Sequence, residues 1–410
     1  MTSGSADTDI LIAGGGIAGA TLALLLAEKG FSVLLAEPRP PDSAAVVDDV
    51  GQRVVALNQA SRQVLAMASG WPAPDAAGPT AYRTMQIEDE RGTGRLTFEA
   101  FEHGVEALGW IVDHRQLHGV LWQRLRAGRV RLLAGRAVVA VDDNGADGEI
   151  ASARLDDGTL LKTRLLIAAD GARSALRQGL GIPLAATAYG QKALVAVIMT
   201  REPNSGIAWQ RFLSGGPLAL LPVTRGRSSI VWSLPDERAA AMIAAGDDEF
   251  HRALNTASRE VFGPVEASGP RAAFALDMQL ARRYVAGRVV LLGDAAHRTH
   301  PLAGQGLNLG LADCAALLAV LGTEQRPLAA PRSWLRRWER ARRSEDEIMI
   351  RATDLINRTM SPALGPFSAP RSWLAGFGLA AVDRLWPLKD WLFRRAAGLT
   401  PPAAPLLRQP

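Results

Sequence analysis

The chain has a single cysteine, Cys314, among its 410 residues. One cysteine cannot close a disulfide within the chain, and it excludes a metal site built from cysteines. This cysteine usage is compatible with a reducing compartment. The His/Glu spacing typical of a metal site is missing as well, so we expect no bound metal.

Lysine is almost as scarce, because only four of the 46 basic residues are lysine and the other 42 are arginine. The sequence has no dense basic run interleaved with aromatic residues, which is the pattern typical of a nucleic-acid surface. The net charge of +5 is modest for this length. We therefore interpret the arginine excess as coding bias and expect no nucleic-acid partner.

Internal repeats and long low-complexity linkers are also missing. With 48% hydrophobic and 21% charged residues, the composition indicates a globular protein of two or three domains. Residues 10–27 carry no charge and are as long as a short membrane span. They contain four glycines, however, and acidic Asp7 and Asp9 precede them, whereas a signal peptide begins with basic residues. We expect a strand, a turn and a helix there, not a leader or an anchor.

The N-terminal segment has a Gly-x-Gly-x-x-Gly turn between an apolar strand and a helix, and Glu37 ends the next strand. The expected strand, turn, helix and second strand cover residues 9–13, 14–19, 20–29 and 32–36. Gly14 permits the tight turn, Gly16 lets a pyrophosphate approach the backbone, and Gly19 allows close helix packing. Because Glu37 can bond ribose hydroxyls, the pattern predicts dinucleotide binding. It does not distinguish FAD from NAD.

Two further apolar strands end in similar turns. Residues 165–168 lead to Asp170 and a glycine, and residues 289–292 lead to Gly293, Asp294 and a glycine-rich loop before a helix. A helix N-terminus attracts negative charge through its free N–H groups and its dipole. Taken alone, Asp170 is better explained as the cap of an ordinary helix start. Three such turns are more than a simple NAD domain needs.

Together these turns resemble the class A flavin monooxygenases, which have the para-hydroxybenzoate hydroxylase fold. Within that class, residues 300–310 (HPLAGQGLNLG) resemble the signature of the ubiquinone-biosynthesis hydroxylases (UbiH/VisC type). Asn58 departs from the family, which usually has serine there, and residues 38–50 and the tail beyond about 330 match less well. The blocks that extend the similarity over residues 8–320 are Arg53-x-x-Ala56-Leu57, Tyr189-Gly190-Gln191 and residues 209–212, 216–222 and 229–232.

The resemblance implies an α/β fold. We expect a Rossmann-like FAD-binding domain of the glutathione-reductase type, an inserted antiparallel-sheet substrate domain and a helical C-terminal segment. A run of expected strands between residues 193 and 234 independently favours the separate antiparallel sheet. The expected FAD-binding domain covers residues 1–75, 105–185 and 286–370, the substrate domain 76–104 and 186–285, and the C-terminal segment 371–410.

The resemblance also implies which residues contact the cofactor, FAD. Arg53 and Arg115 would approach it from the side, with a surface or domain-bridging role as the alternative for each. Asp170 would touch FAD, and Asp294 would bond its ribityl chain. The pyrophosphate, ribose and flavin-edge contacts would come from Gly14, Gly16, Gly19, Glu37, Gly293, Gly304, Gly306, Leu307 and Asn308.

The implied activity is that of an FAD-dependent monooxygenase that uses NAD(P)H and O2. A C4a-hydroperoxide of the flavin would hydroxylate the aromatic ring of a polyprenyl phenol or quinol in ubiquinone biosynthesis. His297 and His300 are candidate general bases, and Pro301 lies in the loop beside the reacting flavin. A histidine in this loop can equally orient it. The alternatives are a hydroxylase or reductase of another lipophilic metabolite, and a non-catalytic flavoprotein scaffold subunit.

Residues 373–395 carry apolar and aromatic side chains at helical spacing, flanked by arginines and a lysine. Such a segment can lie on an anionic membrane surface, or it can pack as a helix on the flavin domain or in a dimer. Both alternatives stay open. With a polyprenylated substrate, we expect a cytoplasmic protein, peripheral on the inner face of the cytoplasmic membrane. Other ubiquinone-biosynthesis proteins would then be its partners.

Overall fold

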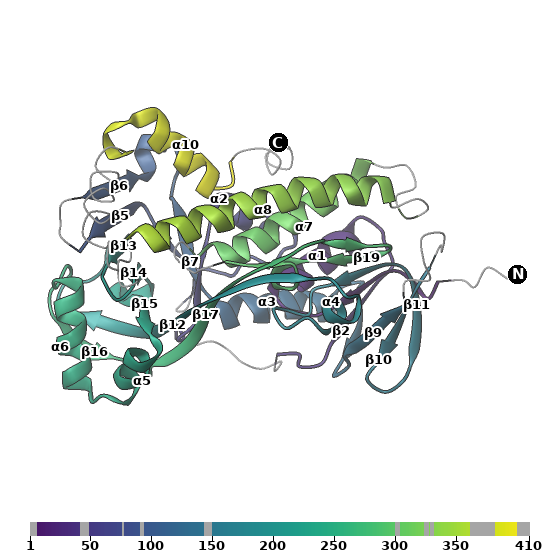
Figure 1. The fold of residues 1–410 in the computed structure, drawn as a ribbon, viewed down its shortest axis with the longest axis horizontal. Coiled ribbons are helices and arrows are strands. Elements are labelled where there is room, and N and C mark those ends of the chain that lie inside the picture. The colour runs from purple at the N-terminus through teal and green to yellow at the C-terminus, as the bar shows by residue number, and fades with distance from the viewer. Residues whose placement is uncertain are drawn as a thin grey trace, which may run out of the picture.

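The computed structural model describes residues 6–41, 49–75, 78–90, 94–142, 150–299, 304–323, 328, 332–360 and 382–399. In this part of the chain, two large sheets and a small one are combined with helices that cover the first sheet and one end of the second (Figure 1).

The first sheet is centred on β1 (Thr8–Ala13) and has the order β18-β19-β11-β1-β2-β8. Its other strands are β2 (Val33–Glu37), β8 (Arg131–Ala134), β11 (Leu160–Ala168), β18 (Val285–Ala286) and β19 (Val289–Leu291). β1 runs parallel to β2 and β11, and β11 runs parallel to β19. The central strands are apolar and buried, as expected for a parallel sheet covered on both faces. The three turns that the sequence singled out therefore lie at one edge of this sheet.

β11 is longer than the apolar strand expected at 165–168, because it begins five residues earlier, at Leu160. Its first half pairs antiparallel with β10 (Ala151–Leu155), which pairs with β9 (Val138–Asp142). Its second half pairs in parallel with β1. The first half alternates between exposed and buried residues and the second half is wholly buried, so the pattern changes within one strand.

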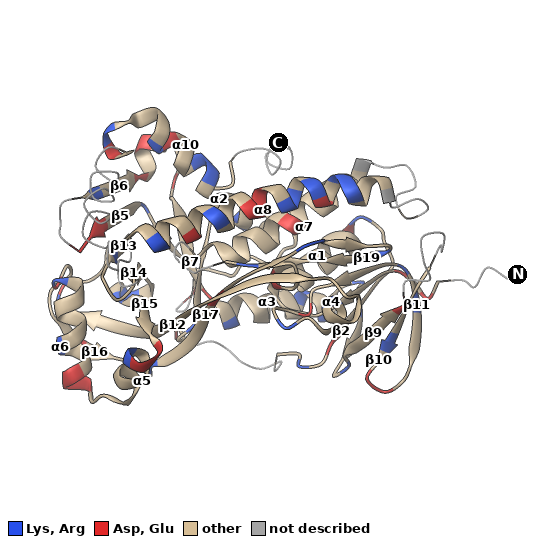
Figure 2. Cartoon of the chain, in the orientation of Figure 1, with Lys and Arg blue, Asp and Glu red and all other residues tan. Residues whose placement is uncertain are grey.

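The helices of the first sheet are α1 (Ile17–Glu28), α2 (Gln59–Met67), α3 (His114–Ala127), α4 (Ala175–Gly179), α7 (Gln305–Thr323) and α8 (Arg332–Met360). α7 contains Gln305–Gly322, the one helical stretch of the described residues that is long and apolar enough to cross a membrane. Because 61% of that stretch is buried and α7 packs on α1, α2 and α8, we interpret it as a core helix. α8 lies along α7 and carries charged residues along its length (Figure 2).

The second sheet has the order β20-β17-β12-β15-β14-β13-β5-β6 and is antiparallel apart from the β13–β5 pair. Its strands are β5 (Thr84–Asp89), β6 (Arg95–Glu99), β12 (Leu184–Thr200), β13 (Ile207–Phe212), β14 (Leu218–Pro222), β15 (Ser228–Pro235), β16 (Val265–Ser268, beside β12), β17 (Ala272–Ala281) and β20 (His297–Arg298). β12 begins nine residues earlier than the expected strand at 193–200, and its pairing register shifts between Ala188 and Lys192, next to Gly190 at φ +65°. α5 (Asp236–Ala244) and α6 (Asp247–Ser258) pack on this part of the fold.

A small third sheet was not expected. It joins β3 (Val54–Leu57), β7 (Gly109–Asp113) and β4 (Thr80–Tyr82), which come from distant parts of the chain. Arg53 immediately precedes β3, and His114 follows β7 and begins α3. The backbone N–H of His114 donates to the carbonyl of Arg53 at 3.0 Å, so the sheet brings these two residues together.

The described part of the tail forms α10 (Trp386–Ala396), which packs against β6 and the 3-10 helix at Ala100–His103. Phe393 is buried there with Leu96 and Phe98. The side-chain amide of Asn58 at the start of α2 also donates to the carbonyl of Ala396 at 2.9 Å. α10 thus packs mainly on residues of the expected substrate domain and contacts the expected flavin domain through Asn58. The choice between packing and membrane contact stays a prediction, and residues 371–381 and 400–410 of the expected segment lie outside the described residues.

The expected domain boundaries stay a prediction. The first sheet and the second sheet alternate along the chain, as a discontinuous domain requires. β20, however, falls within the expected FAD segment 286–370 and pairs with β17 of the second sheet.

Candidate active site

A cavity of about 490 Å³ is lined by the turns of the first sheet and by one face of the second sheet. Its volume lies within the range of roughly 300–1,000 Å³ typical of small-molecule sites. The expected site residues that line it are Gly16, Gly19, Arg53, Gly293, Asp294, Gly304, Gly306 and Leu307.

The glycines of the first turn have different reasons to be glycine. A Cβ on Gly14, whose φ is +110°, would lie 2.2 Å from the carbonyl oxygen of Ala169. A Cβ on Gly19 would lie 2.1 Å from the carbonyl oxygen of Gly14. A Cβ on Gly16 would meet nothing within 4 Å, and Gly16 lines the cavity. Gly14 and Gly19 are therefore required by the turn itself, whereas Gly16 leaves open space in front of the N-terminus of α1.

The turn is held from behind by side chains that bond Gly15. Oε2 of Glu37 accepts the N–H of Gly15 at 2.6 Å, and Nε1 of Trp122 donates to its carbonyl at 2.8 Å. Nε2 of His118 lies 2.8 Å from the same carbonyl. Glu37 also accepts the N–H of Arg39 at 2.8 Å and is not among the cavity-lining residues. In this geometry Glu37 shapes the turn, and its ribose contact stays a prediction.

A second helix N-terminus, that of α7, reaches the cavity through Gly306 and Leu307. Neither α1 nor α7 has an acidic residue in its first turn. Two uncompensated positive helix ends therefore face the same cavity and favour a ligand with negative charge.

Asn308, one residue further along α7, is used for a different purpose. Its side-chain amide donates to the carbonyls of Ala56 at 2.9 Å and Gly304 at 3.1 Å. Its oxygen accepts the hydroxyl of Ser61 at 2.6 Å and the N–H of Asn58 at 3.1 Å. The side chain thus ties α7 to β3 and α2, and it is not among the residues that line the cavity.

Charged groups gather at one side of the cavity, where Arg53, Asp294, Arg298 and Asp277 contribute to the lining and Arg298 pairs with Asp277. Burial lowers the pKa of the Arg53 guanidinium, and the carboxylate of Asp294 opposes this shift. His114 also lines the cavity. Burial, followed by the nearby Arg53 cation, lowers the pKa of His114 to about 3, so its imidazole is neutral at physiological pH.

The remaining expected residues lie elsewhere. Arg115 donates to the carbonyl of Asp49 at 3.3 Å and is not among the lining residues. Asp170 accepts the N–H of Leu176 at 3.3 Å, as the helix-cap alternative requires. Its other oxygen is buried and has no hydrogen-bond partner within the described ranges. His297 is fully buried behind the cavity against Asp313, and His300 and Pro301 lie outside the described residues.

The second sheet supplies a wall that the sequence reasoning missed. Alternation along its strands puts large side chains such as Trp209 and Trp232 on the face packed with α5 and α6. The opposite face lines the cavity with Gln210, Leu221 and a majority of small residues, namely Ala193, Val195, Ala208, Ala219, Ser229, Val231 and Ser233. The hydroxyl of Ser229 is buried and has no hydrogen-bond partner among the described residues. The alternation of small and large residues in 207–212 and 218–235 is the signal that could have revealed this wall.

The residues present fit FAD. The open space at Gly16, the two helix ends and the partnerless oxygen of Asp170 beside cavity-lining Gly171 suit a ligand that carries a pyrophosphate and polar groups. The wall of the second sheet adds an apolar compartment next to these groups. The cavity thus offers positively polarised polar groups for a dinucleotide and, beside them, an apolar surface for a second ligand.

Comparisons with known proteins identify the family to which the chain belongs. The family described as "FAD binding domain" matches residues 7–353. The ubiquinone hydroxylase UbiL of Rhodospirillum rubrum is 35% identical over 406 residues, which cover 97% of this chain and 91% of that protein. The 3-demethoxyubiquinol 3-hydroxylase of Escherichia coli is 32% identical, with coverage of 96% and 99%.

Among solved structures, PqsL of P. aeruginosa in complex with 2-aminobenzoylacetate matches with a TM-score of 0.73 at 22% identity, covering 90% of this chain and 99% of that one. That likeness supports the fold. The expected fold, enzyme class and FAD cofactor are confirmed. The chain therefore belongs to the FAD-binding monooxygenase family and is an FAD-dependent aromatic hydroxylase.

Proposed function

We propose that this chain hydroxylates the aromatic ring of a polyprenyl phenol or quinol in ubiquinone biosynthesis. The observation that carries the proposal is that one cavity is lined both by the strand-end turns of the first sheet and by the mostly small residues of the second sheet. The full-length relatives named as ubiquinone hydroxylases support this choice of substrate.

FAD would lie along the turns of the first sheet. Its pyrophosphate would face Gly16 at the N-terminus of α1, and its ribityl chain would bond Asp294. The backbone amides at Gly306 and Leu307 would face the pyrimidine edge of the flavin, where negative charge gathers on reduction. Arg53 would contact the cofactor from the side. Bound FAD, reduced by NAD(P)H, supplies the oxygen-transfer chemistry with O2.

The chain's own contribution is to hold the ring and to keep water away. Ala208, Ala219 and Val231 leave room for a flat ring against the second sheet and make that wall apolar. The buried hydroxyl of Ser229 and the side chain of Gln210 on the same wall would bond the phenol oxygen. His114, with a pKa near 3, is too weak a base to take the phenol proton, but its neutral ring can accept a hydrogen bond.

The proposal is tested by deleting the gene and identifying the accumulating quinone precursor by mass spectrometry. We expect one polyprenyl phenol that lacks a single hydroxyl group, and return of the quinone on complementation. An unchanged quinone pool would overturn the substrate assignment. An assay of NAD(P)H oxidation by the purified, FAD-bound protein distinguishes the hydroxylase from the scaffold alternative. A scaffold would show no oxidation stimulated by a phenol.

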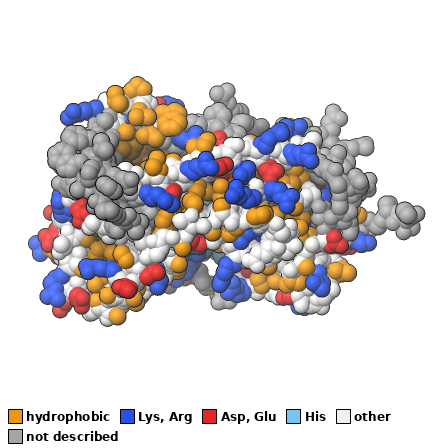
Figure 3. Space-filling view, in the orientation of Figure 1, with side chains coloured by type: hydrophobic (Ala, Val, Ile, Leu, Met, Phe, Trp, Pro, Cys, Tyr) orange, Lys and Arg blue, Asp and Glu red, His pale blue; other side chains and the backbone are white. Residues whose placement is uncertain are grey.

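We further propose that the protein binds the membrane surface through α10. Leu385, Trp386, Leu388 and Trp391 are 40–55% exposed, and Phe101 beside them is 78% exposed. Figure 3 shows hydrophobic side chains gathered on this part of the surface, next to arginines. Exposed tryptophans flanked by arginines suit an anionic bilayer and a polyprenylated substrate. Such a surface would also place the protein beside other ubiquinone-biosynthesis proteins.

Flotation with vesicles that contain phosphatidylglycerol tests this surface. The double variant Trp386→Ala/Trp391→Ala is expected to lose most of the vesicle-bound fraction. Leu160→Ala, which removes an apolar side chain that is 68% exposed on the distant strand β11, is the matched control. Equal flotation of wild type and the double variant would contradict the proposal.

A further inference from the structure

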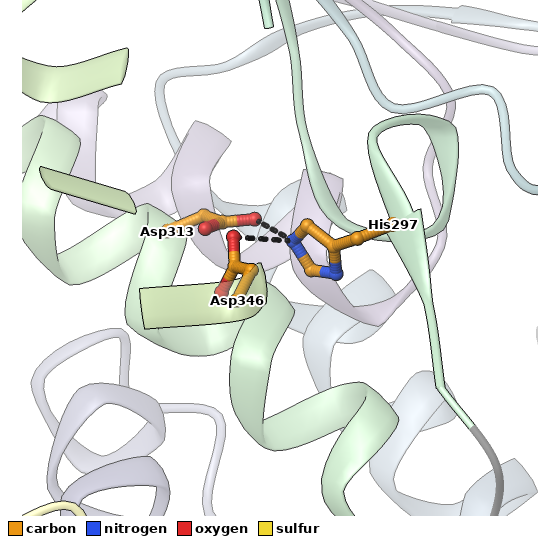
Figure 4. Close-up of side chains that lie close together, drawn as sticks. All are labelled: His297, Asp313 and Asp346. Atoms are coloured by element: carbon orange, nitrogen blue, oxygen red, sulfur yellow. Dashed lines mark hydrogen bonds and ion pairs between the residues drawn. The ribbon is translucent and has the colours of Figure 1, made fainter. Parts of the chain in front are cut away.

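A buried cluster of charged and polar side chains lies directly behind the loop that carries Asp294. It consists of Tyr284, His297 on β20, Asp313 on α7, and Arg342 and Asp346 on α8. All five residues are buried, and none is more than 2% exposed. Figure 4 shows the imidazole of His297 pointing at the two carboxylates.

The contacts within the cluster are short. Nε2 of His297 lies 2.7 Å from Oδ2 of Asp313 and 3.5 Å from Oδ2 of Asp346. Arg342 donates to Asp313 at 2.7 Å and to Asp346 at 2.5 Å, and Tyr284 donates to Asp346 at 3.1 Å. Buried charges are costly unless they are paired, so two carboxylates call for two cations. Arg342 is one, and a protonated His297 is the other.

The same geometry argues against a metal ion at this place. His297, Asp313 and Asp346 are close enough together to hold a cation. Arg342 already places its guanidinium on both carboxylates. The positive charge that a metal would bring is thus supplied by the chain.

One carboxylate connects the cluster to the cavity. Oδ2 of Asp313, which contacts His297, also accepts the backbone N–H of Gly293 at 3.1 Å. Gly293 adopts φ +60° and immediately precedes Asp294. Asp313 also belongs to α7, whose N-terminus lines the cavity at Gly306. His297 therefore bonds the carboxylate of Asp313, which connects α7 to the loop that carries Asp294.

We propose that His297 is a positioning residue which, as an imidazolium between Asp313 and Asp346, fixes the Asp294 loop and the N-terminus of α7 for FAD binding. It does so in place of the general-base role considered from the sequence, since His297 is not among the residues that line the cavity. The inference rests on the proposed contact between Asp294 and FAD.

The protonation of the cluster gives the inference a pH signature. Burial lowers the pKa of His297, but the carboxylates of Asp346 and Asp313 outweigh burial and raise it to about 9. Burial raises the pKa of Asp346 to about 6. Between these values the cluster is neutral. The other titratable groups that adjoin it are Tyr284 and Cys314, whose pKa values burial raises, and Glu345, which pairs with Arg342 at 3.3 Å.

Because the pKa of His297 is raised on folding, its contribution is complete below its ordinary value of 6.5 and is lost as the pH rises through about 9. Above that pH the cluster carries a net negative charge, and the contact between His297 and Asp313 no longer fixes the Asp294 loop. FAD affinity is then expected to fall by about tenfold per pH unit.

The experiment titrates apoprotein with FAD from pH 6.5 to 10 and follows the quenching of flavin fluorescence. Wild type is expected to bind with constant affinity to about pH 8.5 and more weakly above it. His297→Gln should bind about tenfold more weakly at pH 7.5 and should lack the alkaline decline. The charge-balanced double variant His297→Gln/Asp346→Asn should recover most of the affinity. His251→Gln, which replaces a histidine on α6 that bonds Ser268 and is not among the cavity-lining residues, is the control and should bind as wild type.

Two results would overturn the inference. One is wild-type FAD affinity in His297→Gln together with a lower melting temperature, which would make the cluster a stabiliser of the core only. The other is a flat wild-type profile to pH 10, which decides the question even if His297→Gln does not fold. Asp294→Ala separates the two proposals: if it binds FAD like wild type, the proposed cofactor contact fails. If only Asp294→Ala weakens binding, the inference about His297 fails alone.

Discussion

The carboxylate of Glu37 and the backbone N–H of Gly15 are joined by a hydrogen bond of 2.6 Å that crosses from the end of β2 to the glycine turn. The bond explains why an acidic residue follows this strand even though its side chain does not line the cavity. The turn, and with it the open space at Gly16, depends on a side chain 22 residues away.

Replacement of Glu37 tests this role. In Glu37→Ala the N–H groups of Gly15 and Arg39 lose their acceptor. The Arg39 group is exposed and can bond water, whereas an unsatisfied buried donor such as that of Gly15 costs about 1–3 kcal/mol. We expect a lower melting temperature and weaker FAD binding together. Glu37→Gln keeps an acceptor oxygen and is expected to lie between Ala and wild type. If Glu37→Ala lowers FAD affinity and leaves the melting temperature unchanged, the carboxylate acts on the ribose and not on the turn.

Two glycines of the turn are expected to affect different properties, Gly19 the folding of the chain and Gly16 the binding of FAD. Gly19→Ala places a Cβ only 2.1 Å from the carbonyl oxygen of Gly14, so we expect a chain that is insoluble or melts many degrees lower. Gly16→Ala meets nothing within 4 Å and is expected to melt as apoprotein like wild type. Its methyl group occupies space in the cavity, so FAD affinity should fall by about tenfold or more.

The comparison is made by differential scanning calorimetry of apoprotein and by FAD titration. Gly246→Ala, at an exposed helix start with open space around it, controls for the general cost of replacing glycine. Full FAD affinity in Gly16→Ala would contradict the proposal that the pyrophosphate lies at the N-terminus of α1.

The wall of the second sheet predicts a variant that keeps FAD and loses the substrate. In Ala219→Phe a large ring fills the space between β14 and the turns, while the helix-covered face of the sheet is untouched. FAD content is expected to stay at the wild-type level, and phenol-stimulated NAD(P)H oxidation should fall by at least about tenfold. Ala219→Ser adds only one oxygen atom and controls for replacing this residue without filling the cavity. Unchanged stimulation in Ala219→Phe would place the ring elsewhere.

The three strand-end turns could be predicted from the sequence because each depends on a few adjacent residues, and the carboxyl ends of parallel strands meet at one edge. Gly16, Gly171 and Asp294 reach the cavity for that reason. The role of His297 could not be predicted in this way, because its partners Asp313 and Asp346 lie on two later helices. Only the packing of α7 and α8 brings their charges together.

Two other features were hidden by local pattern. The sequence singled out Arg115, but the start of α3 puts its neighbour His114 at the cavity and directs Arg115 toward Asp49. The small-residue wall was missed because alanine and serine carry no motif. Their alternation with large residues marks one face of each strand, and the register of β13, β14 and β15 joins these faces into one wall.

The last prediction concerns the attachment of α10, which depends on a buried lysine. Lys389 lies 3.2 Å from a carboxylate oxygen of Glu102 and 3.3 Å from one of Asp383, and its side chain is 7% exposed. Lys389→Ala leaves these carboxylates without their cation and opens a gap beside Phe98. Because both carboxylates are partly exposed, we expect the attachment of α10 to lose about 1–2 kcal/mol of stability and not the larger cost of a fully buried pair.

This loss of stability should appear as faster proteolysis within α10, measured by mass spectrometry of the C-terminal fragment. Arg394→Ala, which breaks an exposed pair with Asp390 on the same helix, is expected to change the cleavage rate little. Equal cleavage rates in Lys389→Ala and wild type would show that the apolar contacts of Phe393 hold the helix without the lysine.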